Sequence, residues 1–405
     1  MANTLLTVDE ITAEALRVLH NNLKFVAAID KQHDKQSEIA GQKRGGSIRI
    51  RKPIQPTVRT TWALNAQDVT EEYETLTVGT VRGVDLNFTE AEMSQDITSF
   101  SRQFITPSVK RLASEIDKLT FAGCVNDVYN LVGTAGTTPN AASYYLSAGA
   151  RMNHFATPEE DRVVIINPDA QASTVGGLSS LFHAASAIEA QYKKGRMGKD
   201  ALGFNDWYMS QNVPTITCGT RTGTILIDGT VATEGSTTIH IDGLGSAGLT
   251  VKEGEVFTVA DCYAVNPETK ATLPFLQQFV VQADVTATGT TECDVTVLPK
   301  IYTSDSGGLQ TVDSFPTDGK AVTFTGTAST AYPHNLAFHP EFATFATANL
   351  EMPADVSFKS QMSVDGINIR ILRQYDINNS MHPCRMDVFF GYLVQRPSMA
   401  CRIIG

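Results

Sequence analysis

The chain has 405 residues, enough for about two to three domains with substantial apolar cores. Its formal net charge of −11 argues against a protein that coats nucleic acid with its whole surface. The N-terminus has no basic region followed by an apolar run, and no stretch approaches the roughly 20 apolar residues of a membrane-spanning helix. We therefore expect a soluble protein made in the cytoplasm, in which the six scattered cysteines stay reduced.

The first predicted element is an amphipathic helix over residues 9–29. Thr7 and Glu10 have the spacing of a capping box, which marks a helix start. Apolar residues then recur at helical spacing, at Leu16, Leu19, Leu23 and Val26. A polar stretch, 30–46, follows and ends in two glycines. A helix tethered in this way either packs on its own chain or docks on a neighbour, and the sequence does not choose between the two.

A charged segment follows, in which a basic stretch precedes an acidic one. Residues 47–52 alternate like a strand, with Ile48 and Ile50 on one face, and residues 77–88 alternate again. We expect a long two-stranded excursion with a basic arm and an acidic return. The basic residues are Lys43, Arg44, Arg49, Arg51, Lys52 and Arg59, and the acidic residues are Asp68, Glu71, Glu72 and Glu74.

Three interpretations compete for this charged excursion. It could be a solvated hairpin, or a nucleic-acid patch whose field the acidic return partly cancels. The interpretation we favour is a contact with another copy of the same chain, basic arm to acidic surface. The acidic partner would be residues 68–74 of a neighbour, or the helix face around Glu115 and Asp117.

The next predicted helix covers residues 106–124. Thr106 can cap its first turn and Pro107 suits its first position, and an apolar stripe runs from Val109 to Leu119. A helix over 140–155 comes next. The β-branched run 163–166 then predicts a buried strand, which Asn167 and Pro168 end by starting another helix. A further helix is expected at 178–191.

The composition changes at Cys218. Through Tyr332 the chain is rich in Thr, Val and Gly, with turn signals between short alternating runs. About six strands, at 224–227, 238–241, 255–259, 279–285, 294–298 and 321–325, predict a small barrel or sandwich inserted between α/β segments. The chain returns at Asn335 and ends in strands at 367–372, 385–395 and 399–404.

No catalytic, cofactor-binding or metal-binding motif is recognisable. The sequence contains no nucleophile elbow, no zinc-binding helix and no calcium loop. Asp and Glu residues are abundant, but the sequence alone does not select a pair of them. We therefore predict neither an enzyme nor a cofactor.

The order of these segments resembles the major capsid proteins of tailed phages with the Hong Kong 97-type fold. It is most similar to the branch from short-tailed temperate phages, which carries an extra β-barrel insertion domain. The resemblance rests on segments spread over the whole chain and not on one diagnostic motif. They are the capped N-terminal helix, the hairpin 43–88, the helix from Thr106, the strand and turn 163–169, the motifs 203–206 and 213–214, residues 335–340, and Gly391-Tyr392 followed by Arg396-Pro397.

The resemblance implies an α+β fold with a peripheral domain, an axial domain and an inserted all-β barrel. The implied divisions are an N-terminal arm at 1–36, an extended β-hairpin loop at 37–90, the spine helix and peripheral domain at 91–135, the axial domain at 136–217, the barrel at 218–333, and return strands at 334–405. The Lys–Asn crosslink of some relatives is absent from this branch, and we assign no such pair.

The same resemblance implies a protein that assembles with itself into pentamers and hexamers of an icosahedral virion shell. The shell would form in the host cytoplasm as a scaffolded procapsid and expand as double-stranded DNA enters. Since the chain begins directly with the arm, the scaffolding protein is expected to be separate. A portal protein is a further partner, DNA is contacted weakly and non-specifically, and no membrane is involved. The alternatives are a non-viral structural or surface β-rich protein, which the missing secretion signal disfavours, and an α/β enzyme with a β-domain lid.

Overall fold

The computed structural model describes residues 8–31, 47–51, 62–64, 66, 73–89, 106–177, 198–288, 291–304, 309–356, 358–364, 366–379 and 381–405. The chain forms two compact units, each assembled from separate stretches of sequence. Unit 1 combines Met1–Ile50, Tyr73–Phe121 and Ala343–Gln395, and unit 2 combines Arg51–Glu72, Ala122–Phe342 and Arg396–Gly405. None of the helices in the described ranges is both long and apolar enough to cross a membrane.

Unit 1 is built on a five-stranded antiparallel sheet whose central strand is β20 (Met381–Val394). Met386, Val388 and Phe390 are buried at alternate positions of β20, and Asp387 on the opposite face is buried as well, 2.6 Å from Arg370 Nη2. Its other strands are β3 (Thr80–Thr89), β17 (Ala343–Thr347), β18 (Phe358–Val364) and β19 (Ile367–Arg373).

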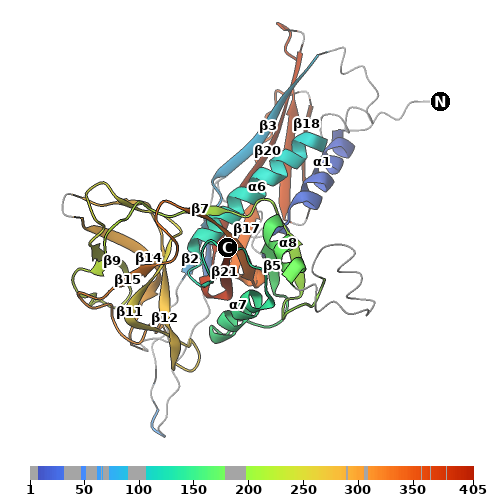
Figure 1. Cartoon of the computed structure of the whole chain (residues 1–405). Coiled ribbons are helices and arrows are strands. Elements are labelled where there is room, and N and C mark those ends of the chain that lie inside the picture. The colour runs from blue at the N-terminus through green and yellow to red at the C-terminus, as the bar shows by residue number, and fades with distance from the viewer. Residues whose placement is uncertain are drawn as a thin grey trace. The chain divides into compact units, whose positions relative to one another are not determined.

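The N-terminal segment packs on its own chain, which settles the alternative that the sequence left open. Helix α1 (Val8–Asn22) lies against β18 and β19 (Figure 1), and buries Ala15, Leu16 and Leu19 completely. The single helix predicted for 9–29 is two helices, α1 and α2 (Phe25–Ala28), and Leu23 and Lys24 between them are not helical. The ring of Phe25 stacks on that of Phe121 at 4.5 Å, which ties α2 to helix α6 (Thr106–Asp127).

The predicted pairing of the charged excursion was wrong. Strand β1 (Ser47–Arg51) pairs with β2 (Tyr73–Thr77) in a separate two-stranded sheet, while β3 pairs with β20. The sequence shows strand character but not the strand partner, and β20 is remote in sequence. Gly83 helps to explain why β3 can pair with β20. It lies opposite Asp387, where a Cβ would come within 2.5 Å of the Asp387 Oδ1 atom, so only glycine leaves room for that side chain.

Unit 2 contains a mixed six-stranded sheet. All four residues of β5 (Val163–Ile166) are buried, as the β-branched run predicted. Asn167 Oδ1 accepts the Ala170 N–H at 2.8 Å and so caps α8 (Pro168–Gly177), also as predicted. Helix α7 (Ala142–His154) packs on this sheet, whereas the helix predicted at 178–191 lies outside the described residues. The other strands are β4 (Leu131–Gly133), β6 (Asp206–Met209), β7 (Thr215–Thr217), β16 (Ala331–Phe338) and β21 (Ala400–Ile404).

The second six-stranded sheet of unit 2 nearly closes on itself (Figure 1). Its edges are joined where the Ile227 N–H donates to the Lys320 carbonyl at 2.9 Å and the Val322 N–H donates to the Ile225 carbonyl at 3.0 Å. In order its strands are β15 (Val322–Phe324), β11 (Val256–Val265), β12 (Thr272–Val281), β14 (Cys293–Ile301), β9 (Ser236–Asp242) and β8 (Leu226–Ile227). The short strands β10 (Thr250–Val251) and β13 (Val285–Thr286) pair with each other in a separate two-stranded sheet. Two 3-10 turns, Pro340–Phe342 and Pro397–Met399, complete the described helices.

The near-closed sheet shares an apolar cluster with the mixed sheet of the same unit. Leu131 and Ile404 of the mixed sheet pack with Val256 and Val280. In addition, Arg402 Nη1 donates to the Gly254 carbonyl at 2.7 Å. Whether residues 218–333 fold without this support stays a prediction.

Candidate assembly surface

The small sheet β1–β2 has one buried face and one charged face. Ile48 and Ile50 are buried in an apolar cluster, whereas Arg49 and Arg51 of the same strand are exposed. The cluster is completed by Leu76, Val78 and Ala346. The predicted alternation is therefore confirmed, and burial of the two isoleucines fixes which way the arginines face.

Arg49 lies over an aromatic ring on the neighbouring strand. Its guanidinium carbon is 4.8 Å from the ring centroid of Tyr73, which is itself 54 % exposed. A cation over the face of an aromatic ring is attracted by the ring quadrupole, so this contact orders the side chain. Glu74, next to Tyr73, is half-buried. The β1–β2 sheet thus presents a cation, stacked on an aromatic ring, on its solvent side.

Most of the other predicted contact residues lie outside the described part of the chain. These are Lys43, Arg44, Lys52, Arg59, Asp68, Glu71 and Glu72. Their role in contacts between subunits stays a prediction.

Asp117 was predicted on an exposed acidic face, and this was wrong. Its side chain is 1 % exposed. Its Oδ1 atom accepts the backbone N–H groups of Lys24 at 3.2 Å, Phe25 at 2.9 Å and Val26 at 3.1 Å. A carboxylate in this position satisfies the free N–H groups at the start of α2 and opposes the positive end of that helix. Asp117 therefore holds the N-terminal segment within its own subunit.

The exposed face of α6 is basic and does not offer a partner for a basic arm. Glu115 is exposed as predicted, but its exposed neighbours at helical spacing are Lys110, Arg111 and Lys118. One acid among three bases gives this face a positive charge. Of the two acidic partners considered from the sequence, the stretch 68–74 is the one that remains.

Two large apolar side chains that were not among the predicted contact residues are also exposed. Trp62 is fully exposed and Leu64 is 86 % exposed, in the stretch between β1 and β2. Trp62 is one of only two tryptophans in the chain, and it stands in a polar region, so it could have been noticed. Large apolar residues kept at the surface commonly mark a protein contact.

Within the described residues, few groups are arranged as a reactive nucleophile or a metal site would require. All six cysteines are free, and burial raises the pKa of the Cys401 thiol to about 12 and of Cys262 to about 12, which keeps both in the unreactive thiol form. One group in these residues could hold a metal ion, namely Asp228, His240 and Glu292 on the near-closed sheet.

Solved structures of phage capsids are similar to the chain over most of its length. The Mycobacterium phage Che8 structure is 12 % identical, with a TM-score of 0.46, and covers 94 % of this chain and 90 % of its own. The capsid of Cyanophage P-SCSP1u is 10 % identical, with a TM-score of 0.43, and covers 89 % and 83 %. A domain structure, the CUS-3 coat protein I-domain, is 24 % identical, with a TM-score of 0.19, and covers 25 % of this chain and 96 % of its own. Among curated proteins no match is found.

The class of protein follows from the family comparison: it is a phage major capsid protein, a structural component of the virion that associates with copies of itself in an icosahedral shell. Residues 14–405 match the family model described as "P22 coat protein - gene protein 5", so the chain belongs to the P22 coat protein family.

Proposed function

We propose that this coat protein assembles as pentamers and hexamers of a scaffolded procapsid, which forms in the host cytoplasm and expands when double-stranded DNA is packaged. A separate scaffolding protein and a portal protein are its partners in this process. The fold is of the Hong Kong 97 type, with residues 218–333 as an inserted β-barrel domain. Membership of the coat protein family and the near-closed sheet support this proposal. The net charge of −11 favours weak and non-specific contact with DNA.

The observation that carries the proposed assembly mode is the two-faced sheet β1–β2. Its apolar face is buried within the subunit, and its basic face with Arg49 and Arg51 is exposed. We propose that this basic face contacts the acidic stretch 68–74 of a neighbouring subunit. The basic exposed face of α6 would repel it, and Asp117 is buried, which supports the choice of the acidic stretch.

Each contact of this kind contributes little by itself. An exposed ion pair stabilises by about 0–1 kcal/mol, and salt weakens it. A closed shell repeats every contact at many interfaces, so several modest pairs together govern assembly.

Charge reversal at the basic face tests this mode. Arg49→Glu with Arg51→Glu should leave the subunit folded, with a normal far-UV circular dichroism spectrum and a melting temperature lowered by a few degrees at most, but prevent closed shells in negative-stain microscopy. Arg49→Lys with Arg51→Lys keeps the charge and is the matched control, which should assemble. If the reversed protein forms normal shells at both low and high salt, β1–β2 is a solvated hairpin and the proposal is wrong.

A second change identifies the partner. Replacing Glu71, Glu72 and Glu74 by lysine in the reversed protein should restore shells in part, because attraction returns with the signs exchanged. The same lysines in the wild-type background should impair assembly. Failure of both results would exclude the stretch 68–74 as the partner.

A further inference from the structure

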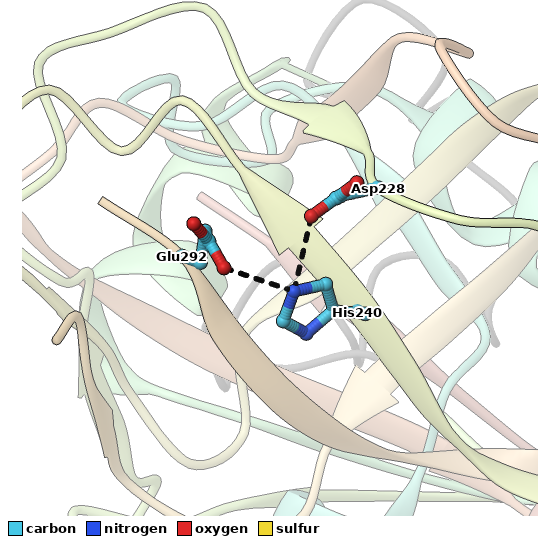
Figure 2. A group of neighbouring side chains, drawn as sticks. All are labelled: Asp228, His240 and Glu292. Atoms are coloured by element: carbon cyan, nitrogen blue, oxygen red, sulfur yellow. Dashed lines mark ion pairs between the residues drawn. The ribbon is translucent and has the colours of Figure 1, made fainter. Parts of the chain in front are cut away.

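Three neighbouring strands of the near-closed sheet bring a histidine and two carboxylates together on its outer side. Asp228 directly follows β8, His240 lies within β9, and Glu292 directly precedes β14. Figure 2 shows both carboxylates pointing at one ring nitrogen of His240. That atom, Nε2, is 3.2 Å from Asp228 Oδ2 and 3.4 Å from Glu292 Oε2.

The other ring nitrogen is engaged by a fourth side chain. His240 Nδ1 lies 2.7 Å from Asp294 Oδ1, and the two residues face each other in the register of β9 and β14. A carboxylate on Nδ1 fixes the ring orientation and favours the tautomer whose lone pair is on Nε2. Histidines that bind metal ions almost always have a partner of this kind on their other nitrogen.

The spacing of the three candidate ligand atoms matches the coordination shell of a small metal ion. Zinc holds nitrogen and oxygen ligands at about 2.0–2.2 Å in a tetrahedron, so neighbouring ligand atoms lie about 3.3–3.6 Å apart. The two distances from Nε2 come close to this value, and all three ligand atoms lie within 4.8 Å of one another. The three atoms are therefore close enough together for one small ion to contact all of them.

The excess of negative charge around His240 would also stabilise a bound cation. Asp228, Glu292 and Asp294 surround a single imidazole, and Asp242 lies two residues further along β9 on the same face as His240. The Oδ1 atom of Asp242 is buried and has no hydrogen-bond partner among the described residues. Buried carboxylate oxygens are normally satisfied, and like charges on adjacent strands oppose one another.

We propose that Asp228, His240 and Glu292 bind a divalent transition-metal ion, with zinc as the ion that best suits this ligand set. An imidazole nitrogen among the ligands disfavours magnesium and calcium, which prefer oxygen ligands alone. The ion would join β8, β9 and β14 at the base of the loop 228–236 and complete its shell with water. Asp294 is a positioning residue, because it acts on the ion only through His240.

The competing occupant of Nε2 is a proton. The hydrogen bond that the His240 ring donates to Asp294, with Glu292 and Asp228 nearby, raises the pKa of His240, so an imidazolium would also be stabilised here. A proton and a metal ion exclude one another at the same lone pair. Direct measurement of bound metal distinguishes the two.

The experiment is equilibrium dialysis of the full-length protein against micromolar zinc with millimolar magnesium present, followed by elemental analysis. Magnesium occupies weak carboxylate sites, so retained zinc reports the proposed one. We expect a single zinc ion per chain, lost in His240→Ala and in the double variant Asp228→Asn with Glu292→Gln, which keeps the imidazole. Asp294→Asn should weaken zinc affinity by about 10–100-fold.

Asp284→Asn is the matched control, because Asp284 is an exposed carboxylate of the same unit that pairs with Lys252 and not with a histidine. It should retain zinc like the wild type. If the wild type retains no zinc, the group holds only a proton and the proposal is wrong. It is equally wrong if both His240→Ala and the carboxylate double variant retain as much zinc as Asp284→Asn. Neither result bears on shell assembly through β1–β2, which is measured separately.

Discussion

The two-stranded sheet β1–β2 and the near-closed sheet differ in how much of their stabilisation they supply themselves. β1–β2 buries only Ile48 and Ile50 from its first strand and relies on Ala346 from elsewhere in unit 1. The near-closed sheet encloses its own core, with Ile239, Phe257, Phe279, Val295 and many others fully buried. Since stability follows buried apolar area, the near-closed sheet is expected to be far the more stable of the two.

Charged side chains follow the same division. Next to the near-closed sheet, at residues that precede β8 and β11, Arg221 Nη1 lies 2.5 Å from Glu255 Oε1, and the side chains are only 8 % and 1 % exposed. In β1–β2, Arg49 lies on a half-exposed ring at the surface. The buried pair of Arg221 and Glu255 therefore stabilises the folded subunit. The exposed arginine does little for the subunit, which leaves it available to a neighbour.

The largest expected effect is the presence or absence of a fold in isolated residues 218–333. With its own core, this fragment should unfold in a single cooperative transition monitored by circular dichroism. Val256 and Val280 lose their partners Leu131 and Ile404, so its melting temperature should lie below that of the whole chain. A disordered spectrum would show that the sheet depends on the rest of unit 2.

Glu255→Ala should have the next largest effect, destabilising the chain by about 3–5 kcal/mol in urea unfolding, because it leaves the buried Arg221 guanidinium without its counter-charge. The lost acceptor for the Lys252 N–H, at 2.7 Å, adds to this. The double variant Arg221→Met with Glu255→Leu should cost less than the single change, since no charge is then left buried. A double variant as unstable as the single would mean that packing, and not charge, is responsible.

Asp117→Ala should cost about 1–3 kcal/mol, because three backbone N–H groups at the start of α2 lose their acceptor. Glu115→Ala is the matched control on the exposed face of the same helix, and its effect should stay within about 0.5 kcal/mol. Urea unfolding measures both. Equal effects would show that burial does not decide what an acid on α6 contributes.

The sequence predicted the elements well wherever the signal was local. The β-branched strand 163–166, the cap at Asn167 and the start of α6 at Thr106 are confirmed, because side-chain type and short spacing suffice to define them. The alternation in β1 correctly placed Ile48 and Ile50 inside. The helix α6 continues to Asp127, three residues past the predicted end, since the apolar stripe continues there.

What the sequence could not supply was pairing between remote segments. The partner of β3 is β20, and nothing in the alternation of either strand names the other. Asp117 looks like a surface acid by spacing, and only the return of the chain at Phe25 buries it. The proposed metal site escaped notice for the same reason: His240 and its positioning residue Asp294 are 54 residues apart and meet only through strand register.

The smallest effect is expected for Arg49→Ala, and it tests the comparison most directly. The guanidinium lies 4.8 Å from the centroid of a ring that is 54 % exposed, and a cation–π contact at such a site contributes about 0.5–1 kcal/mol. Urea unfolding of the unassembled subunit should therefore detect a loss of at most about 1 kcal/mol, and Tyr73→Leu, which removes the ring but keeps the charge, should show a similar loss. In assembly the two variants should differ, because only Arg49→Ala removes the charge offered to a neighbour, so its yield of shells should fall while that of Tyr73→Leu changes less. A large loss of subunit stability in Arg49→Ala would mean that β1–β2 contributes to folding as the near-closed sheet does, and the distinction between the two sheets would be lost.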